Sequence, residues 1–165
     1  MSLSRILKHL LLPDWFVQRI FASADLASIG AAVTACEQSH RGELRFVVEG
    51  PLPLSALWRD LSPRERAVDL FSQLRVWDTD ENSGILIYVQ LVDHRVEILA
   101  DRGIAARVPQ AEWDAICRAM EASFHRGEWR QGALQAVTRA GELLARHFPA
   151  GASNPNELPD QPLVL

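Results

Sequence analysis

The amino-acid sequence predicts an α/β fold, a three-layer α/β/α sandwich around a small mixed sheet of three to four strands. Residues 85–91 are almost entirely β-branched, aromatic or apolar, and a turn at Asp93 and His94 leads into a second extended run at residues 95–100. These two runs predict a β-hairpin. Residues 43–49 form a third run of strand-forming residues, and helical patterns precede, separate and follow the three runs.

The composition is that of an ordinary globular protein. With 165 residues, of which 48% are hydrophobic and 23% charged, the chain suits one compact domain with a real core. The net charge of −4 and the scattered basic residues argue against nucleic-acid binding, which depends on clustered Lys and Arg. No run is long and apolar enough for a transmembrane segment or a signal-peptide core, and we expect a reduced, cytoplasmic location.

The N-terminal segment, residues 1–22, contains a short amphipathic pattern. A helix over residues 4–12 would end at Pro13. Four apolar residues share one face of this helix: Ile6, Leu7, Leu10 and Leu11. The interpretation we favour is that this face docks on the protein's own core. The alternative is weak peripheral contact with a membrane surface through residues 4–12.

The next part of the chain predicts two helices around the first strand. Apolar spacing predicts a helix that Ser23 caps and Gly42 ends. Residues 50–61 predict a loop. Ser62 and Glu65, with a proline directly after the serine, form a strong helix start. Because this second helix connects the first strand to the hairpin, the first two strands should be parallel with a right-handed connection.

The C-terminal third predicts two helices and a tail. Apolar spacing indicates helices over residues 109–125 and 129–147, separated at Gly127. Residues 150–165 are rich in proline and predict an extended or disordered tail. The main domain should therefore comprise residues 23–149.

Acidic and polar residues gather at the ends of the predicted strands. A hairpin returns the chain to its starting edge, and parallel strands begin at a common edge, so these residues should converge. They are Glu37, Glu43, Asp78, Asp80, Asn82 and Asp101. Carboxylate and amide oxygens on loops are suitable ligands for a hard cation such as Ca²⁺ or Mg²⁺. This edge is a candidate cation site.

The same residues also have simpler interpretations. Residues 78–82 have the composition of a solvated turn and lack the twelve-residue calcium-loop pattern. For Asp101, Arg102 and Gly103 we favour a turn in which Gly103 adopts a positive φ. The functional alternative makes Asp101 a ligand and lets Arg102 bind a substrate phosphate through two hydrogen bonds.

Several motifs together resemble the TPM domain, the domain of the thylakoid photosystem-repair phosphatase and of many bacterial proteins. The resemblance covers about residues 26–149. Its motifs are Glu37 with Gly42-Glu43 before a strand, residues 82–87 (NSGILI), 96–98 (VEI) and 101–104 (DRGI), Trp113, Phe124, Gly127, Gly132 and His147-Phe148-Pro149. Ser83 departs from the pattern, because an asparagine is common at this position.

The resemblance implies the three-layer α/β/α fold and, as in some relatives, calcium binding and a modest acid phosphatase activity. By position it implies an acidic rim with the metal ligands Glu37, Asp78, Asp80, Asn82 and Asp101. A bound cation would polarise phosphoryl oxygens while either Asp80 or Asp101 positions water. The alternative function is a noncatalytic module that binds an unknown protein partner, in membrane or stress-related quality control.

Overall fold

The computed structural model describes residues 3–13, 15–151 and 155–165. Within these ranges the chain forms eight helices and four strands. In chain order they are α1 (Leu3–Leu11), α2 (Phe16–Ile20), α3 (Ser23–Glu37), β1 (Leu44–Glu49), α4 (Leu54–Trp58), α5 (Pro63–Gln73), β2 (Ile85–Gln90), β3 (Arg95–Ala100), α6 (Arg102–Ala105), α7 (Gln110–His125), α8 (Trp129–His147) and β4 (Leu163–Val164).

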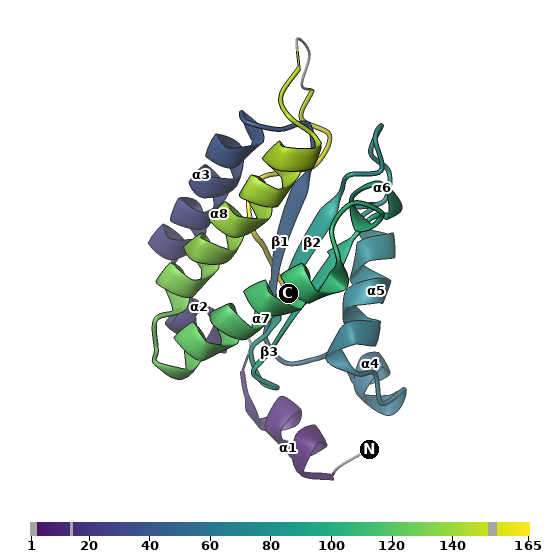
Figure 1. The fold of residues 1–165 in the computed structure, drawn as a ribbon. Coiled ribbons are helices and arrows are strands. Elements are labelled where there is room, and N and C mark those ends of the chain that lie inside the picture. The colour runs from purple at the N-terminus through teal and green to yellow at the C-terminus, as the bar shows by residue number, and fades with distance from the viewer. Residues whose placement is uncertain (1–2, 14, 152–154) are drawn as a thin grey trace.

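The strands form one mixed sheet in the order β3-β2-β1-β4. β1 and β2 are parallel, in a register that sets Leu44 opposite Ile85 and Glu49 opposite Gln90. β2 and β3 form the predicted antiparallel hairpin. Figure 1 shows α3, α7 and α8 on one side of the sheet and α5 on the other. The predicted α/β/α sandwich with a mixed sheet is confirmed.

Strand residues alternate between two buried clusters, one on each face of the sheet. Leu44, Phe46 and Val48 of β1 pack in the larger cluster, which contains side chains of α3, α7 and α8. Val47, between them, packs in the second cluster together with Leu70 of α5. Every residue of β1 and β2 is buried, as expected for strands covered on both faces.

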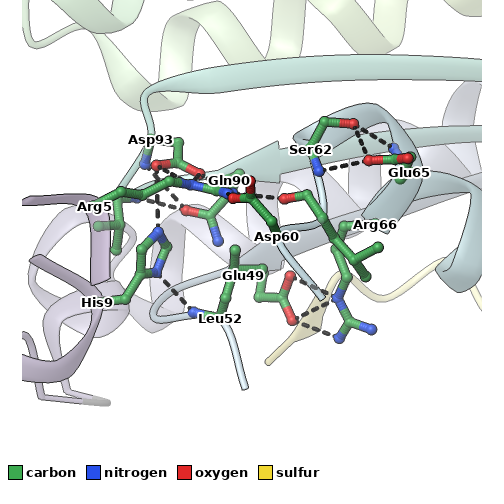
Figure 2. A network of polar contacts seen from close by, with 12 residues as sticks. Arg5, His9, Glu49, Leu52, Asp60, Ser62, Glu65, Arg66, Gln90 and Asp93 are labelled. Carbon is green, nitrogen blue, oxygen red and sulfur yellow. Dashed lines mark hydrogen bonds and ion pairs between the residues drawn. The ribbon is translucent and has the colours of Figure 1, made fainter. Parts of the chain in front are cut away.

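The predicted start of α5 is confirmed. The Ser62 hydroxyl oxygen accepts a hydrogen bond from the Glu65 backbone N–H at 3.2 Å, and a Glu65 carboxylate oxygen accepts one from the Ser62 backbone N–H at 2.8 Å (Figure 2). This reciprocal pair satisfies two N–H groups that a helix start otherwise leaves free.

Two local predictions differ from the structure. α3 ends at Glu37 rather than at Gly42, and its N-cap is Ala22, so Ser23 is the first helical residue. The segment 50–61, predicted as a loop, contains α4. Tertiary packing explains α4, because a local cluster buries its apolar side chains: Leu52, Ala56, Leu57 and Leu61.

The two ends of the chain pack against the domain in ways that the sequence did not show. Residues 163–164 pair with β1 as β4, and the Leu158 side chain is buried. At the other end, α1 docks through its polar side, so the predicted burial of its leucine face on the core is wrong: Leu7 and Leu10 are exposed. Along the described ranges, no helix has both the length and the apolarity needed to cross a bilayer.

A buried ion pair joins β1 to α5 (Figure 2). The Arg66 guanidinium donates to both carboxylate oxygens of Glu49, with a shortest distance of 2.6 Å. The Tyr88 hydroxyl donates to the same carboxylate at 2.5 Å. Glu49 is only 1% exposed, so its charge depends on these two partners.

We therefore expect Arg66→Met to lower the free energy of unfolding by about 3 kcal/mol, because it leaves the Glu49 charge buried and without its cation. Urea denaturation measures the loss. The double variant Glu49→Gln/Arg66→Met removes the buried charge and should lose less than the single variant. Arg59→Met, at an exposed ion pair with Asp69, is the control and should cost less than about 1 kcal/mol. Equal losses for Arg66→Met and Arg59→Met would contradict this account.

Candidate functional site

The three loops that were predicted to converge lie together at one edge of the sheet. The Ile85 N–H donates to the Glu43 carbonyl at 2.8 Å, which joins the approaches to β2 and β1. The Asp101 N–H donates to the Gly84 carbonyl at 2.9 Å, which joins the end of β3 to the same place. We call this edge, formed by residues 37–43, 78–84 and 101–103, the acidic rim.

Gly103 is needed at the rim because the backbone of the neighbouring loop lies against it. A Cβ atom at this position would be 2.4 Å from the Glu81 carbonyl oxygen. The Gly103 N–H donates to the Asn82 carbonyl at 2.9 Å. The predicted turn with a positive φ at Gly103 is wrong; Asp101 instead caps the short helix α6, and the close approach explains the glycine.

Asp101, Arg102 and Asn82 form the centre of the rim. One carboxylate oxygen of Asp101 accepts from the Arg102 backbone N–H at 2.7 Å. Its other oxygen, Oδ2, is buried and has no hydrogen-bond partner among the described residues. Arg102 Nε donates to the Asn82 side-chain oxygen at 2.9 Å, so this predicted ligand oxygen already holds Arg102.

Asp78 and Asp80 lie on the exposed part of the same loop. The Asp78 carboxylate is 4.0 Å from the Arg75 guanidinium, and both side chains are largely exposed. The backbone N–H of Asp80 donates to the Glu157 carboxylate at 3.0 Å. Glu157 thus brings the C-terminal segment onto the rim.

Glu37 belongs to a separate part of the rim, a small cavity of about 160 Å³. Every side chain that lines this cavity carries an oxygen atom. The lining residues are Thr34, Glu37, Gln38, Glu43, Asn156 and Asp160. We call this cavity the oxygen-lined pocket. Asp160 is fixed in it by a 2.5 Å hydrogen bond from the Thr34 hydroxyl and a 2.6 Å bond from the Asn156 amide.

The carboxyl groups of Glu37 and Glu43 are buried in the rim. Glu37 accepts a hydrogen bond from the Leu44 N–H at 3.1 Å, and Glu43 accepts one from the Leu158 N–H at 3.0 Å. Burial raises the pKa of Glu37 to about 8, and repulsion from Glu43 and Asp160 adds to the effect. Burial likewise raises the pKa of Glu43 to about 7. Both groups therefore carry a proton in much of the population near neutral pH.

The structure thus divides the predicted ligand set. Glu37 lies in the oxygen-lined pocket, Asn82 and Asp101 lie with Arg102, and Asp78 and Asp80 are exposed. In the present side-chain positions, the described residues contain no group of three or more His, Cys, Asp or Glu placed to hold a metal ion. Asn156, Glu157 and Asp160 also lie at this edge and were not among the predicted site residues, because no local pattern shows that the C-terminal segment folds back. Only the short apolar run at residues 163–164 indicates a strand.

The raised pKa values predict how the pH affects stability. Between pH 4.5, the ordinary carboxyl value, and pH 8 the unfolded chain loses the Glu37 proton while the folded chain keeps it. Folding stability contributed by this group therefore falls as the pH rises through this window. The variant Glu37→Gln/Glu43→Gln lacks these two groups and should not show this loss. Between pH 5 and pH 8 in EDTA, its free energy of unfolding minus that of the native chain should therefore rise by roughly 2 kcal/mol, measured by urea denaturation.

The comparison between variants isolates the two carboxyl groups. Burial lowers the pKa of His40, so this group makes folding stability rise with pH. It is present in both the native chain and the double variant, so its effect cancels in the comparison. Glu112→Gln, at an exposed position on α7, should show the pH dependence of the native chain. The assignment is contradicted if the double variant also keeps that dependence.

Comparison with known proteins places the chain in a family. The TPM domain model matches residues 17–143. The NMR structure of the BA42 protein from the psychrophilic bacterium Bizionia argentinensis is similar, with 28% identity, coverage of 88% of this chain and 95% of that chain, and a TM-score of 0.77. The N-terminal domain of a P. gingivalis protein shares the fold, with a TM-score of 0.61. Its sequence is 16% identical, and the match covers 85% of this chain and 94% of that chain. No curated protein sequence matches the chain. Because the match covers most of the chain, this protein belongs to the TPM domain family.

Proposed function

We propose that the protein binds a divalent cation, Ca²⁺ or Mg²⁺, at the acidic rim. The observation that carries the proposal is the pair of buried carboxyl groups, Glu37 and Glu43, in a cavity lined entirely by oxygen-bearing side chains. A cation in this pocket would favour the ionised form of both groups. Binding would then release the protons that the buried groups otherwise keep.

The ligand set in this proposal differs from a simple acidic loop. Glu37, with Glu43 and Asp160, supplies carboxylate oxygens in the pocket, and Thr34 and Asn156 carry further oxygens there. Small side-chain rotations are required, because the carboxylates already accept hydrogen bonds. Glu37 and Glu43 each accept one from a backbone N–H, and Asp160 accepts one from the Thr34 hydroxyl. Ca²⁺ accepts six to eight oxygens in irregular geometry, whereas Mg²⁺ needs a near-ideal octahedron and keeps several waters. An irregular pocket of this kind favours Ca²⁺.

Asp101 gives the rim a second place for a cation. Its Oδ2 atom is buried and lacks a hydrogen-bond partner among the described residues, which is costly for a carboxylate unless a cation or water contacts it. Asp78, Asp80 and the Asn82 side chain lie on the loop beside it. These residues remain candidate ligands for a cation bound at the outer part of the rim.

A weak phosphatase activity is the catalytic extension of this proposal. Arg102 is exposed beside Asp101 and has the charge to bind a substrate phosphate. Asp80 or Asp101 would position the attacking water, and a bound cation would supply charge that polarises the phosphoryl oxygens. A cysteine nucleophile is unfavourable, because burial raises the pKa of the Cys36 and Cys117 thiols to about 12.

A second candidate function is a noncatalytic protein-interaction module. The specific observation in its favour is that the rim already holds an extended peptide, the chain's own C-terminal segment. Two rim residues contact this segment, Asp80 at Glu157 and Glu43 at Leu158, and Arg45 of β1 contacts it at Pro159. An extended segment of a partner protein could make the same backbone contacts with Glu43 and Arg45 and place an acidic side chain against the Asp80 N–H.

Calorimetric titration of the metal-free protein with CaCl₂ and then MgCl₂ tests cation binding. Performed at pH 7.5 in two buffers of different ionisation enthalpy, it should show binding with proton release for the native chain. Glu37→Gln/Glu43→Gln should weaken the affinity by about tenfold or more and abolish the proton release. Glu112→Gln, at an exposed acid outside the rim, is the matched control. If neither cation binds at millimolar concentration, the proposal is wrong.

Hydrolysis of p-nitrophenyl phosphate separates the two candidate functions. The catalytic proposal predicts cation-dependent turnover that falls by at least about tenfold in Asp80→Asn or Asp101→Asn, since each substitution removes a carboxylate that could position water. The interaction module predicts that the native protein has no turnover to lose.

A further inference from the structure

α1 is an amphipathic helix whose apolar face points away from the protein. Arg5 and His9 face the body of the domain, and His9 is buried. The leucines occupy the opposite side of the helix and are exposed, Leu11 at 78%. They are Leu3, Leu7, Leu10 and Leu11. A helix that docks for its own stability normally buries the apolar side, so this orientation needs another explanation.

Polar contacts hold α1 in this orientation (Figure 2). One guanidinium nitrogen of Arg5 donates to the Leu61 carbonyl and to the Asp93 carboxylate, both at 2.8 Å. The His9 Nδ1 atom accepts from the Leu52 N–H at 2.9 Å, and its Nε2 atom lies 3.3 Å from Asp93. Burial alone would raise the pKa of Asp93, but the hydrogen bond and charge of Arg5 outweigh it, so this pKa is lowered and the Asp93 carboxylate stays ionised. The outward leucine face is therefore fixed by the fold.

A second exposed apolar surface lies at the same end of the molecule. α4 presents Leu54 and Trp58, and Trp58 is 83% exposed. The inward side of α1 is linked to the end of α4, because the Arg5 guanidinium lies 3.5 Å from Asp60, just after α4. Figure 1 shows α1 and α4 at the same end of the molecule, opposite the end where α3 and α8 terminate.

The charges at this end indicate what the apolar surface contacts. Lys8 is exposed on α1 among the leucines, and Arg59 is exposed directly after Trp58. The nearby acidic groups Asp60, Asp69 and Asp93 are each paired with an arginine: Asp60 and Asp93 with Arg5, and Asp69 with Arg59 at 3.5 Å. Exposed leucines with tryptophan at the border and basic residues alongside are the chemistry of an anionic membrane surface.

We propose that α1 and α4 form a docking surface for an anionic lipid membrane. The leucines of α1 and Trp58 insert at the level of the lipid headgroups, while Lys8 and Arg59 contact the negative charge. The buried anchor at Arg5, His9 and Asp93 presents the helix already folded, so binding does not have to order it. This inference is independent of cation binding at the acidic rim.

Vesicle sedimentation of the full chain tests the proposal. The probes are vesicles of phosphatidylglycerol and phosphatidylcholine in equal parts and vesicles of phosphatidylcholine alone, both in EDTA so that no cation bridges protein and lipid. The native chain should sediment with the mixed vesicles and much less with the neutral ones. Leu7→Ser/Leu10→Ser should lower the partition coefficient by about tenfold or more, since it removes two inserting side chains. Lys8→Glu should weaken binding to the mixed vesicles only.

The control is Val68→Ser, which removes an exposed apolar side chain on α5 and should bind as the native chain does. Failure of the native chain to sediment overturns the proposal, as does equal binding by Leu7→Ser/Leu10→Ser. Light scattering in solution provides the other decisive outcome. A native dimer that becomes monomeric in Leu7→Ser/Leu10→Ser would assign the surface to a second copy of the chain instead of a membrane.

Discussion

The parallel pairing of β1 with β2 determines where every candidate functional residue of the rim lies. Their register sets Leu44 opposite Ile85, so the loops that precede both strands begin at one edge of the sheet. The antiparallel return of β3 brings Asp101 to the same edge, where it bonds to Gly84. Hydrogen bonds between neighbouring strands thus bring together acidic residues that lie up to 64 positions apart, from Glu37 to Asp101.

The same constraint gathers carboxyl groups at a place that the fold also buries. Glu37 and Glu43 accept backbone hydrogen bonds that hold the start of β1 and the C-terminal segment, so they are structural as well as acidic. Burial raises their pKa values, so both groups carry a proton in much of the population near neutral pH. In the proposed function, a cation that binds here would displace these protons. This exchange would make cation affinity depend on pH.

Local patterns predicted most of the fold. The hairpin and the Ser62 cap depend on neighbouring residues, and topology then placed Glu37 and Asp101 at one edge. Long-range contacts account for what was not predicted. Asp160 joins the oxygen-lined pocket because Arg45 binds the carbonyl oxygens of the C-terminal segment, a contact across more than a hundred residues. The orientation of α1 was not predicted for a similar reason, since polar contacts with distant residues, among them Asp93 and Leu61, outweigh the usual preference for burying leucines.

We propose that buried carboxyl groups at the rim exchange protons for a divalent cation. The most direct test is a ¹³C NMR titration of the glutamate side-chain carboxyl groups, assigned with Glu37→Gln and Glu43→Gln, with and without Ca²⁺. The account predicts that without Ca²⁺ the two groups titrate near pH 8 and pH 7, and that Ca²⁺ moves both pKa values down by more than one unit. Titration of both groups near the ordinary value of 4.5 in the metal-free protein, or pKa values that Ca²⁺ leaves unchanged, would contradict it.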